Sequence, residues 1–170
     1  LIAYQTAYLK AHYPAEFMAF LISLESAHAE NMAFYLQEAK DMGLIILPPD
    51  INNSSIDFTP KNHDHILFGL QGIKNVGLAA LENIINERDK KGPFTSLLDF
   101  CNRIDLRTSN KRVIEHLICS GAFDSIPASR AQKVNDLEKI MDLATEHKKS
   151  AATWQMLLFS MSREAHENNK

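Results

Sequence analysis

Apolar residues recur at intervals of three and four along most of this sequence, and glycine or proline interrupts that spacing at a few positions. Such a period places apolar side chains on one face of an α-helix. Pro14 suits a first helical turn, and Gly43 and Gly121 suit the left-handed residue that ends a helix. The spacing predicts helices over 3–12, 14–23, 30–42, 78–88, 96–103, 110–120 and 130–147.

Residues 44–69 break the helical spacing. Residues 44–47 are a short apolar run closed by two prolines, which is typical of an edge strand or an extended segment. Two further apolar runs, 56–58 and 66–68, flank a polar turn and predict a small β-hairpin. The expected fold is therefore mainly α with one small β-hairpin.

Charge is distributed unevenly along the chain, whose net charge is −3. Residues 1–59 carry 2 basic and 7 acidic side chains, whereas residues 60–130 carry 10 basic and 8 acidic ones. This balance argues against a generally basic nucleic-acid coat protein, and any DNA contact is expected in the middle third. No apolar run is long enough to span a bilayer, so we expect no membrane partner.

The cysteines and the first residues indicate the compartment and the extent of the chain. Cys101 and Cys119 lie in apolar surroundings without metal-ligand spacing, which predicts two buried, reduced thiols. With no signal peptide, a cytoplasmic location is expected. The sequence begins at Leu1, within a helical pattern, and we therefore expect a piece of a longer protein.

Residues 70–85 contain a candidate phosphate-binding hairpin. A short helix is expected to end near Ile73 and a longer helix to begin just after Gly77. Ile73 and Val76 are expected to point inward, while Gly77 opens a helix N-terminus whose free N–H groups favour an anion. Lys74 adds a positive charge, and Asn75 lies within the turn. This arrangement predicts contact with a DNA phosphate; the alternative is an ordinary glycine turn between packed helices.

A second candidate hairpin covers residues 105–112. Arg107, Lys111 and Arg112 gather around an expected helix start, with Ser109 as its predicted N-cap and Asn110 beside it. Because this segment lacks glycine, its backbone is expected to approach phosphate less closely. Alone, this segment is typical of a solvated helix end. Together with the first hairpin, about thirty-five residues earlier, it predicts a pair of phosphate contacts, one from each hairpin.

Catalytic and metal-binding patterns are missing from this sequence. Gly72 and Gly77 have P-loop spacing, but Leu78 and Ala79 follow where a P-loop needs lysine and a hydroxyl residue. The segment 63–65 (His-Asp-His) favours a polar loop over a metal site, and no D-x-D carboxylate pair occurs. We expect no catalytic centre, metal or cofactor in this chain.

Five blocks of the sequence resemble, in family order, the alpha subunits of bacterial DNA polymerase III, the C family of replicative polymerases. The blocks are YQTAYLKAHYPAEFMA (4–19), MG with LPPDIN (42–52), FGL with IKNVG (68–77), NKRV (110–113) and SGAFD (120–124). The resemblance implies fingers helices over 1–43, an extended segment and hairpin over 44–69, and a tandem helix-hairpin-helix module over 70–126. A C-terminal helix over 127–147 and a flexible tail over 148–170 follow.

The resemblance also implies a sliding-clamp motif on that tail. Gln155 would hydrogen-bond in a polar subsite, while Leu158 and Phe159 would fill an apolar groove on the clamp. The alternative is that the apolar residues of segment 154–159 pack back on the domain. One departure lies in the first hairpin, where Asn75 replaces the family's usual glycine; asparagine tolerates a left-handed backbone better than most residues.

The expected function is sequence-independent duplex-DNA binding and clamp tethering, in service of a polymerase. The resemblance implies that the catalytic palm and its Mg²⁺ lie in the rest of the polymerase chain, so no catalysis is expected from this chain alone. The alternative is a structural connector that braces the fingers without touching DNA. A connector would need Lys74, Arg107 and Lys111 engaged by protein carboxylates, whereas DNA binding needs them exposed.

Overall fold

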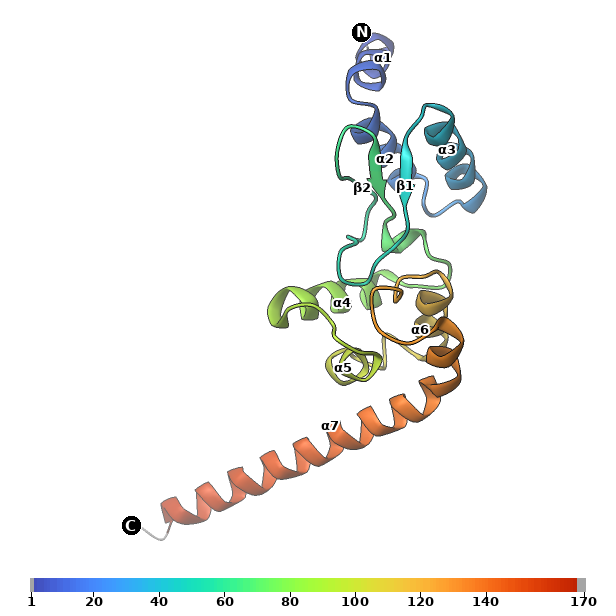
Figure 1. Ribbon diagram of the computed structural model, residues 1–170. Coiled ribbons are helices and arrows are strands. Elements are labelled where there is room, and N and C mark those ends of the chain that lie inside the picture. The colour runs from blue at the N-terminus through green and yellow to red at the C-terminus, as the bar shows by residue number, and fades with distance from the viewer. Residues whose placement is uncertain (1, 168–170) are drawn as a thin grey trace.

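A computed structural model describes the backbone of residues 2–167 and the side chains of residues 2–151 and 153. The chain forms an elongated molecule, with α1 to α3 and a small sheet at one end and α7 running along the other (Figure 1). The helices are α1 (Ile2–His12), α2 (Pro14–Leu24), α3 (Ala29–Asp41), η1 (Leu70–Gly72, a 3₁₀ turn), α4 (Leu78–Lys91), α5 (Leu97–Arg103), α6 (Lys111–Cys119) and α7 (Arg130–Glu167). The strands are β1 (Ile45–Leu47), β2 (Thr59–Pro60) and β3 (His65–Leu67).

The first of two hydrophobic cores lies between α2, α3 and the sheet. Met18, Ile22 and Ile66 have no exposed surface there. The strand order is β1-β3-β2, with β1 parallel and β2 antiparallel to β3. The predicted mainly α fold with a small hairpin is confirmed, but β2 begins after the expected residues 56–58. Residues 44–47, expected as an edge strand or extended segment, supply edge strand β1.

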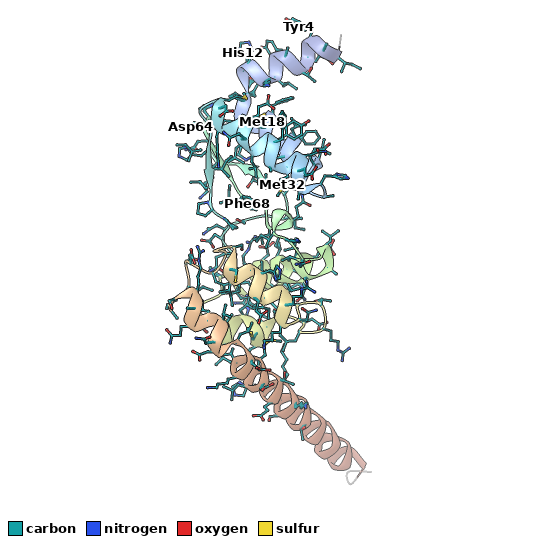
Figure 2. The ribbon with its side chains drawn as sticks, turned by 90° about the vertical axis from the view of Figure 1, so that its right-hand side faces the viewer. Tyr4, His12, Met18, Met32, Asp64 and Phe68 are labelled. Atoms are coloured by element: carbon teal, nitrogen blue, oxygen red, sulfur yellow. The ribbon has the colours of Figure 1, made fainter. Side chains whose placement is uncertain are left out.

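The second core joins α4, α5, α6 and the first half of α7. Phe100 packs edge-on against both Phe94 and Phe123, with ring centroids 4.9 Å apart in each pair. Phe68 contacts both cores and lies 4.6 Å from the Phe58 ring. Figure 2 shows Phe68 at the level where the two parts meet. The hairpin region is thus fixed to the sheet by shared apolar packing.

The predicted glycine stops are confirmed by their backbone angles. Gly43 and Gly121 have φ of +84° and +91°. At Gly121 an added Cβ would also meet the Arg130 guanidinium, which pairs with Asp124 through both of its carboxylate oxygens. Arg130 lowers the pKa of Asp124 by hydrogen bonding to the charged carboxylate. Glycine is therefore required both by the turn and by the ion pair beside it.

Helix α7 is longer than the sequence predicted. A helix was expected over 130–147 and a flexible tail beyond it, but the helical backbone continues to Glu167. Residues 130–167 contain neither glycine nor proline, so nothing local ends the helix where the sequence becomes polar. The predicted clamp residues Gln155, Leu158 and Phe159 follow this helical backbone, and their side chains lie outside the described part of the chain.

Candidate nucleic-acid interface

The first predicted hairpin is formed by η1, a tight turn and α4. The Val76 N–H donates to the Ile73 carbonyl at 3.4 Å, and Asn75 has φ +64°. A positive φ at the third turn residue is the pattern of a type II turn, which accepts glycine or asparagine there. Ile73 is 7% exposed and Val76 is half-buried against the second core. Both inward-facing predictions are confirmed.

Helix α4 begins with an open N-terminus. Gly77 is its N-cap residue and supplies no side-chain hydrogen bond to the first turn. A Cβ added at Gly77 would meet no atom within 4 Å, so space lies in front of this backbone. In the described part of the chain, the N–H groups of Leu78 and Ala79 have no protein acceptor. Lys74 is exposed in the turn that precedes Gly77 and forms no ion pair with a described residue.

The second hairpin lies between α5 and α6 and has a different helix start. Asn110, rather than the predicted Ser109, is the N-cap, and its side-chain oxygen accepts from the Val113 N–H at 3.1 Å. Ser109 is instead fully buried. Arg107 is exposed, and its backbone N–H donates to the Asp105 carboxylate at 2.9 Å, which closes a small turn. The α6 N-terminus is thus partly satisfied by its own side chain.

The cations of the second hairpin point in different directions. Lys111 Nζ lies 3.3 Å from a Glu138 carboxylate oxygen on α7, with both side chains well exposed. Arg112 is exposed and precedes His116 by one helical turn, so the two residues share a face of α6. That face meets the first hairpin, because the Asn75 amide nitrogen lies 2.7 Å from His116 Nε2. Arg112 therefore lies on the α6 face that carries the contact with the first hairpin, whereas Lys111 pairs with α7.

His116 was not anticipated from the sequence. The only local signal was its place four residues after Arg112 in a short helix. Its partner, Asn75, is 41 residues away, and nothing in the spacing indicates that contact. A hollow of about 350 Å³ beside this contact is lined by both the first hairpin and α6, with Lys74 and Cys119 among its lining residues.

Several basic residues of the middle third support the fold instead of a ligand. Arg103 donates to the Glu87 and Gly92 carbonyls at 2.7 Å and lies 4.3 Å above the Phe94 ring. Glu87 lies in the last turns of α4 and Gly92 directly follows the helix, so Arg103 fixes the end of α4 to α5. Arg88 likewise donates to the Ser54 carbonyl at 2.7 Å. The positive charge available to DNA is therefore smaller than the sequence balance suggests.

The prediction of two buried thiols is half wrong. Cys101 is fully buried, and burial raises its pKa to about 12. Cys119 is exposed because it ends α6 on the side away from Ile118, which is buried. One helical step separates a core position from a surface position, and composition alone does not resolve that step.

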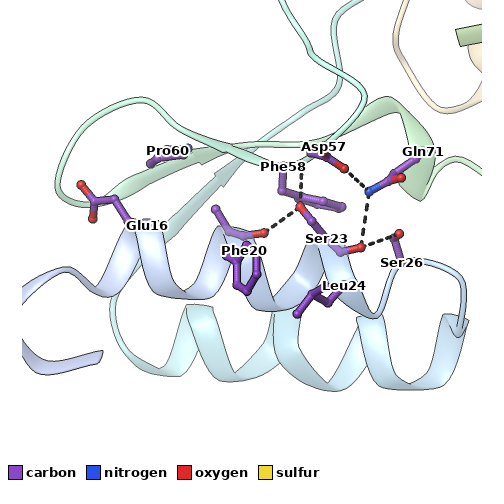
Figure 3. A pocket seen from close by; sticks show the side chains of 10 residues that line it. Glu16, Phe20, Ser23, Leu24, Ser26, Asp57, Phe58, Pro60 and Gln71 are labelled. Atoms are coloured by element: carbon purple, nitrogen blue, oxygen red, sulfur yellow. Dashed lines mark hydrogen bonds between the residues drawn. The ribbon is translucent and has the colours of Figure 1, made fainter. Parts of the chain in front are cut away.

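A larger hollow, of about 700 Å³, lies on the first core and away from the hairpin turns (Figure 3). Its polar groups bond one another: the Ser23 hydroxyl accepts from the Phe58 N–H and donates to the Ala19 carbonyl, while the Gln71 amide donates to Asp57. Among the described residues, no group of three or more metal-ligating side chains occurs in this hollow or elsewhere. None of the described helices has the length and apolar character to cross a bilayer.

Residues 43–133, more than half of the chain, match the family described as the helix-hairpin-helix motif. The match covers both hairpins and the start of α7. The chain belongs to the helix-hairpin-helix family. The fold predicted from the two hairpin sequences is thereby confirmed.

Comparison with individual relatives confirms the polymerase resemblance. The chain is 40% identical to DNA polymerase III subunit alpha of Vibrio cholerae over 98% of its own length. It is 42% identical to the same subunit of Thermus aquaticus over 94%, and 41% identical to that of Escherichia coli K12 over 98%. In each case it spans only 13–14% of the relative.

Proposed function

We propose that this chain binds duplex DNA through backbone phosphates as part of a bacterial replicative polymerase. The observation that carries the proposal is the open N-terminus of α4. There, the N–H groups of Leu78 and Ala79 have no acceptor among the described residues, the space in front of Gly77 is open, and the exposed Lys74 lies in the preceding turn. Free amides, the helix dipole and a lysine together suit a phosphate oxygen. Homology to polymerase subunits and the helix-hairpin-helix match support the same ligand.

The two hairpins contribute unequally under this proposal. The first offers backbone amides that no side chain caps, whereas Asn110 already occupies one amide of the second. Arg112 and Arg107 supply side-chain charge at the second hairpin, without a glycine to bring its backbone close. All these groups recognise phosphate, which is present at every base pair. Binding is therefore independent of sequence.

A titration of the 170-residue chain against a fluorescent random-sequence duplex tests this function. Lys74→Ala is expected to weaken binding about five- to thirtyfold, since charge-assisted hydrogen bonds contribute about 1–2 kcal/mol. Lys90→Ala, at the opposite end of α4, is the matched control and should leave affinity unchanged. Equal affinity of wild type and Lys74→Ala would remove the first hairpin from the interface.

The connector hypothesis has one specific observation in its favour, the Lys111–Glu138 ion pair between α6 and α7. A connector predicts that Lys111→Ala and Glu138→Ala lower the free energy of unfolding by equal amounts and that the double variant loses no more than either single one. It also predicts that neither substitution changes DNA affinity. DNA binding predicts weaker binding for Lys111→Ala and tighter binding for Glu138→Ala, which frees the lysine and removes a negative charge. Lys74 and Arg107, which a connector also needs paired, have no carboxylate partner among the described residues.

Tethering to a bacterial sliding clamp is a further part of the proposed function and rests on sequence. Gln155, Leu158 and Phe159 provide one amide and two apolar side chains at the spacing of the clamp motif. We expect the 170-residue chain to bind purified clamp, and Gln155→Ala with Phe159→Ala to abolish that binding. Met156→Ala, within the same segment, is the control. Binding that persisted in the double variant would reject the motif.

Nucleotide addition belongs, under this proposal, to the rest of the polymerase chain. The palm carboxylates and their Mg²⁺ would lie there, and this chain would hold the duplex product and the clamp. The proposal places the protein in the bacterial cytoplasm, where chromosome replication takes place. Mixing the chain with duplex, nucleotides and Mg²⁺ should therefore give no primer extension.

A further inference from the structure

Both ring nitrogens of His116 have a partner, and one of these contacts connects the two hairpins. Nδ1 lies 2.8 Å from the carbonyl oxygen of Arg112, and Nε2 lies 2.7 Å from the amide nitrogen of Asn75. A carbonyl oxygen only accepts, so Nδ1 carries the hydrogen. In a neutral imidazole Nε2 is then the acceptor, and it receives a hydrogen from the Asn75 amide. Both partners are satisfied by a single tautomer.

The turn that His116 contacts has weak support of its own. Asn75 occupies the left-handed region at φ +64°, which costs energy in any residue with a Cβ. The turn's own hydrogen bond, from Val76 to Ile73, is long at 3.4 Å. Within the described part of the chain, the Asn75 side chain bonds only to His116. The histidine is thus the external constraint on this backbone conformation.

The contact also lies close along the chain to two exposed cations. Lys74 precedes Asn75 in the turn, and Arg112 holds the opposite end of the histidine ring through its carbonyl oxygen. Lys74 and His116 line the same 350 Å³ hollow. Holding Asn75 in place therefore holds Lys74 on one side and the start of α4 on the other.

We propose that His116 is a positioning residue, which fixes the left-handed turn of the first hairpin and makes the two hairpins bind the duplex as one unit. The inference rests on the proposed DNA binding. His116 itself contacts no phosphate; it removes conformational freedom that the turn would otherwise lose on binding. Its loss raises the entropic cost of binding without removing a cation.

Duplex affinity measured across salt concentrations tests the proposal. His116→Ala is expected to weaken binding about three- to tenfold, the equivalent of one hydrogen bond. The slope of log affinity against log salt should stay unchanged, since the number of neutralised phosphates is the same. His116→Gln, which keeps an acceptor, should recover most of the affinity. His147→Ala, an exposed histidine on α7, is the matched control.

A double-mutant cycle separates positioning from general damage. Glycine adopts a positive φ without side-chain support, so Asn75→Gly removes the need for the histidine. In that background His116→Ala should change affinity by less than about twofold. Equal losses in both backgrounds, or wild-type affinity for His116→Ala alone, would overturn the proposal.

Two measurements without DNA keep this inference distinct from the proposed function. Nitrogen NMR shifts should show the neutral His116 ring protonated on Nδ1 and unprotonated on Nε2. Hydrogen exchange at the Val76 amide should be faster in His116→Ala, with the urea midpoint unchanged. If the wild type failed to bind duplex but both results held, DNA binding would be wrong, and the role of His116 in fixing the turn would stand. The opposite tautomer, or unchanged exchange, would refute positioning.

Discussion

Ala128 adopts a backbone conformation that its side chain disfavours. It lies in the loop before α7 with φ +83°, in the region where a Cβ approaches the following carbonyl oxygen. Ala128→Gly should therefore stabilise the protein by about 0.5–1 kcal/mol, after allowing for the extra freedom of glycine in the unfolded chain. The midpoint of urea unfolding measures the gain. Ala33→Gly, at an exposed position in the middle of α3, should instead cost about 1 kcal/mol.

The two thiols should differ sharply in reactivity. Cys101 is fully buried with a pKa of about 12, whereas Cys119 is exposed at the end of α6. Because the thiolate is the reactive form, a thiol reagent at about pH 8 should modify one cysteine per native molecule. Cys119→Ser should remove this fast reaction, and unfolding in urea should restore reaction at Cys101. Rapid labelling of native Cys119→Ser would contradict the assigned burial.

Residue-level prediction from the sequence succeeded where the deciding physics is local. The left-handed tolerance of Asn75 and the helix stops at Gly43 and Gly121 follow from backbone sterics, and all three have positive φ. The role of His116 depends on a contact 41 residues away, so no local pattern could show it. The predicted N-cap of α6 was wrong by one position, since Ser109 and Asn110 are both good N-cap residues. Ser109 is buried by tertiary packing, which the local sequence does not show.

Helices were predicted more reliably in position than in length. The start of α4 directly after Gly77 and of α7 at Arg130 are as the sequence predicted. The end of α7 was not, because a polar composition shows that a helix is exposed and does not show that it stops. The sheet was also only partly predicted, since pairing of β1 with β3 joins segments about twenty residues apart.

Helix α7 should stabilise the molecule through one face of its first half. Leu137 is fully buried against the second core, while Leu143 on the same helix is 46% exposed. Leu137→Ala should lower the free energy of unfolding by about 2–5 kcal/mol, the usual cost of a buried leucine. Leu143→Ala is the matched control and should cost less than about 1 kcal/mol. Equal losses at both positions would show that α7 is not docked through this face.

At the scale of the whole molecule, a net charge of −3 coexists with a small basic surface. The first core and its acidic residues lie at one end, and the hairpins lie between that core and α7 (Figure 1). Of the basic residues in the middle third, Arg88 and Arg103 are bound to backbone carbonyls. The acidic first end is therefore unfavourable for a polyanion, and the basic turns of the hairpins are the more favourable part of the molecule.

The salt dependence of duplex binding should report how many cations take part. Lys74, Arg107, Lys111 and Arg112 are exposed at the two hairpins. Each phosphate neutralised contributes about −0.9 to the slope of log affinity against log salt, so four contacts predict a slope of about −3.6. Each alanine substitution among the four should make the slope shallower by about 0.9, whereas Lys40→Ala, on α3, should leave it unchanged. Binding with a slope near zero would mean that the DNA contact is not made through phosphates, and an unaltered slope in Lys74→Ala with Arg112→Ala would place the contact on another face.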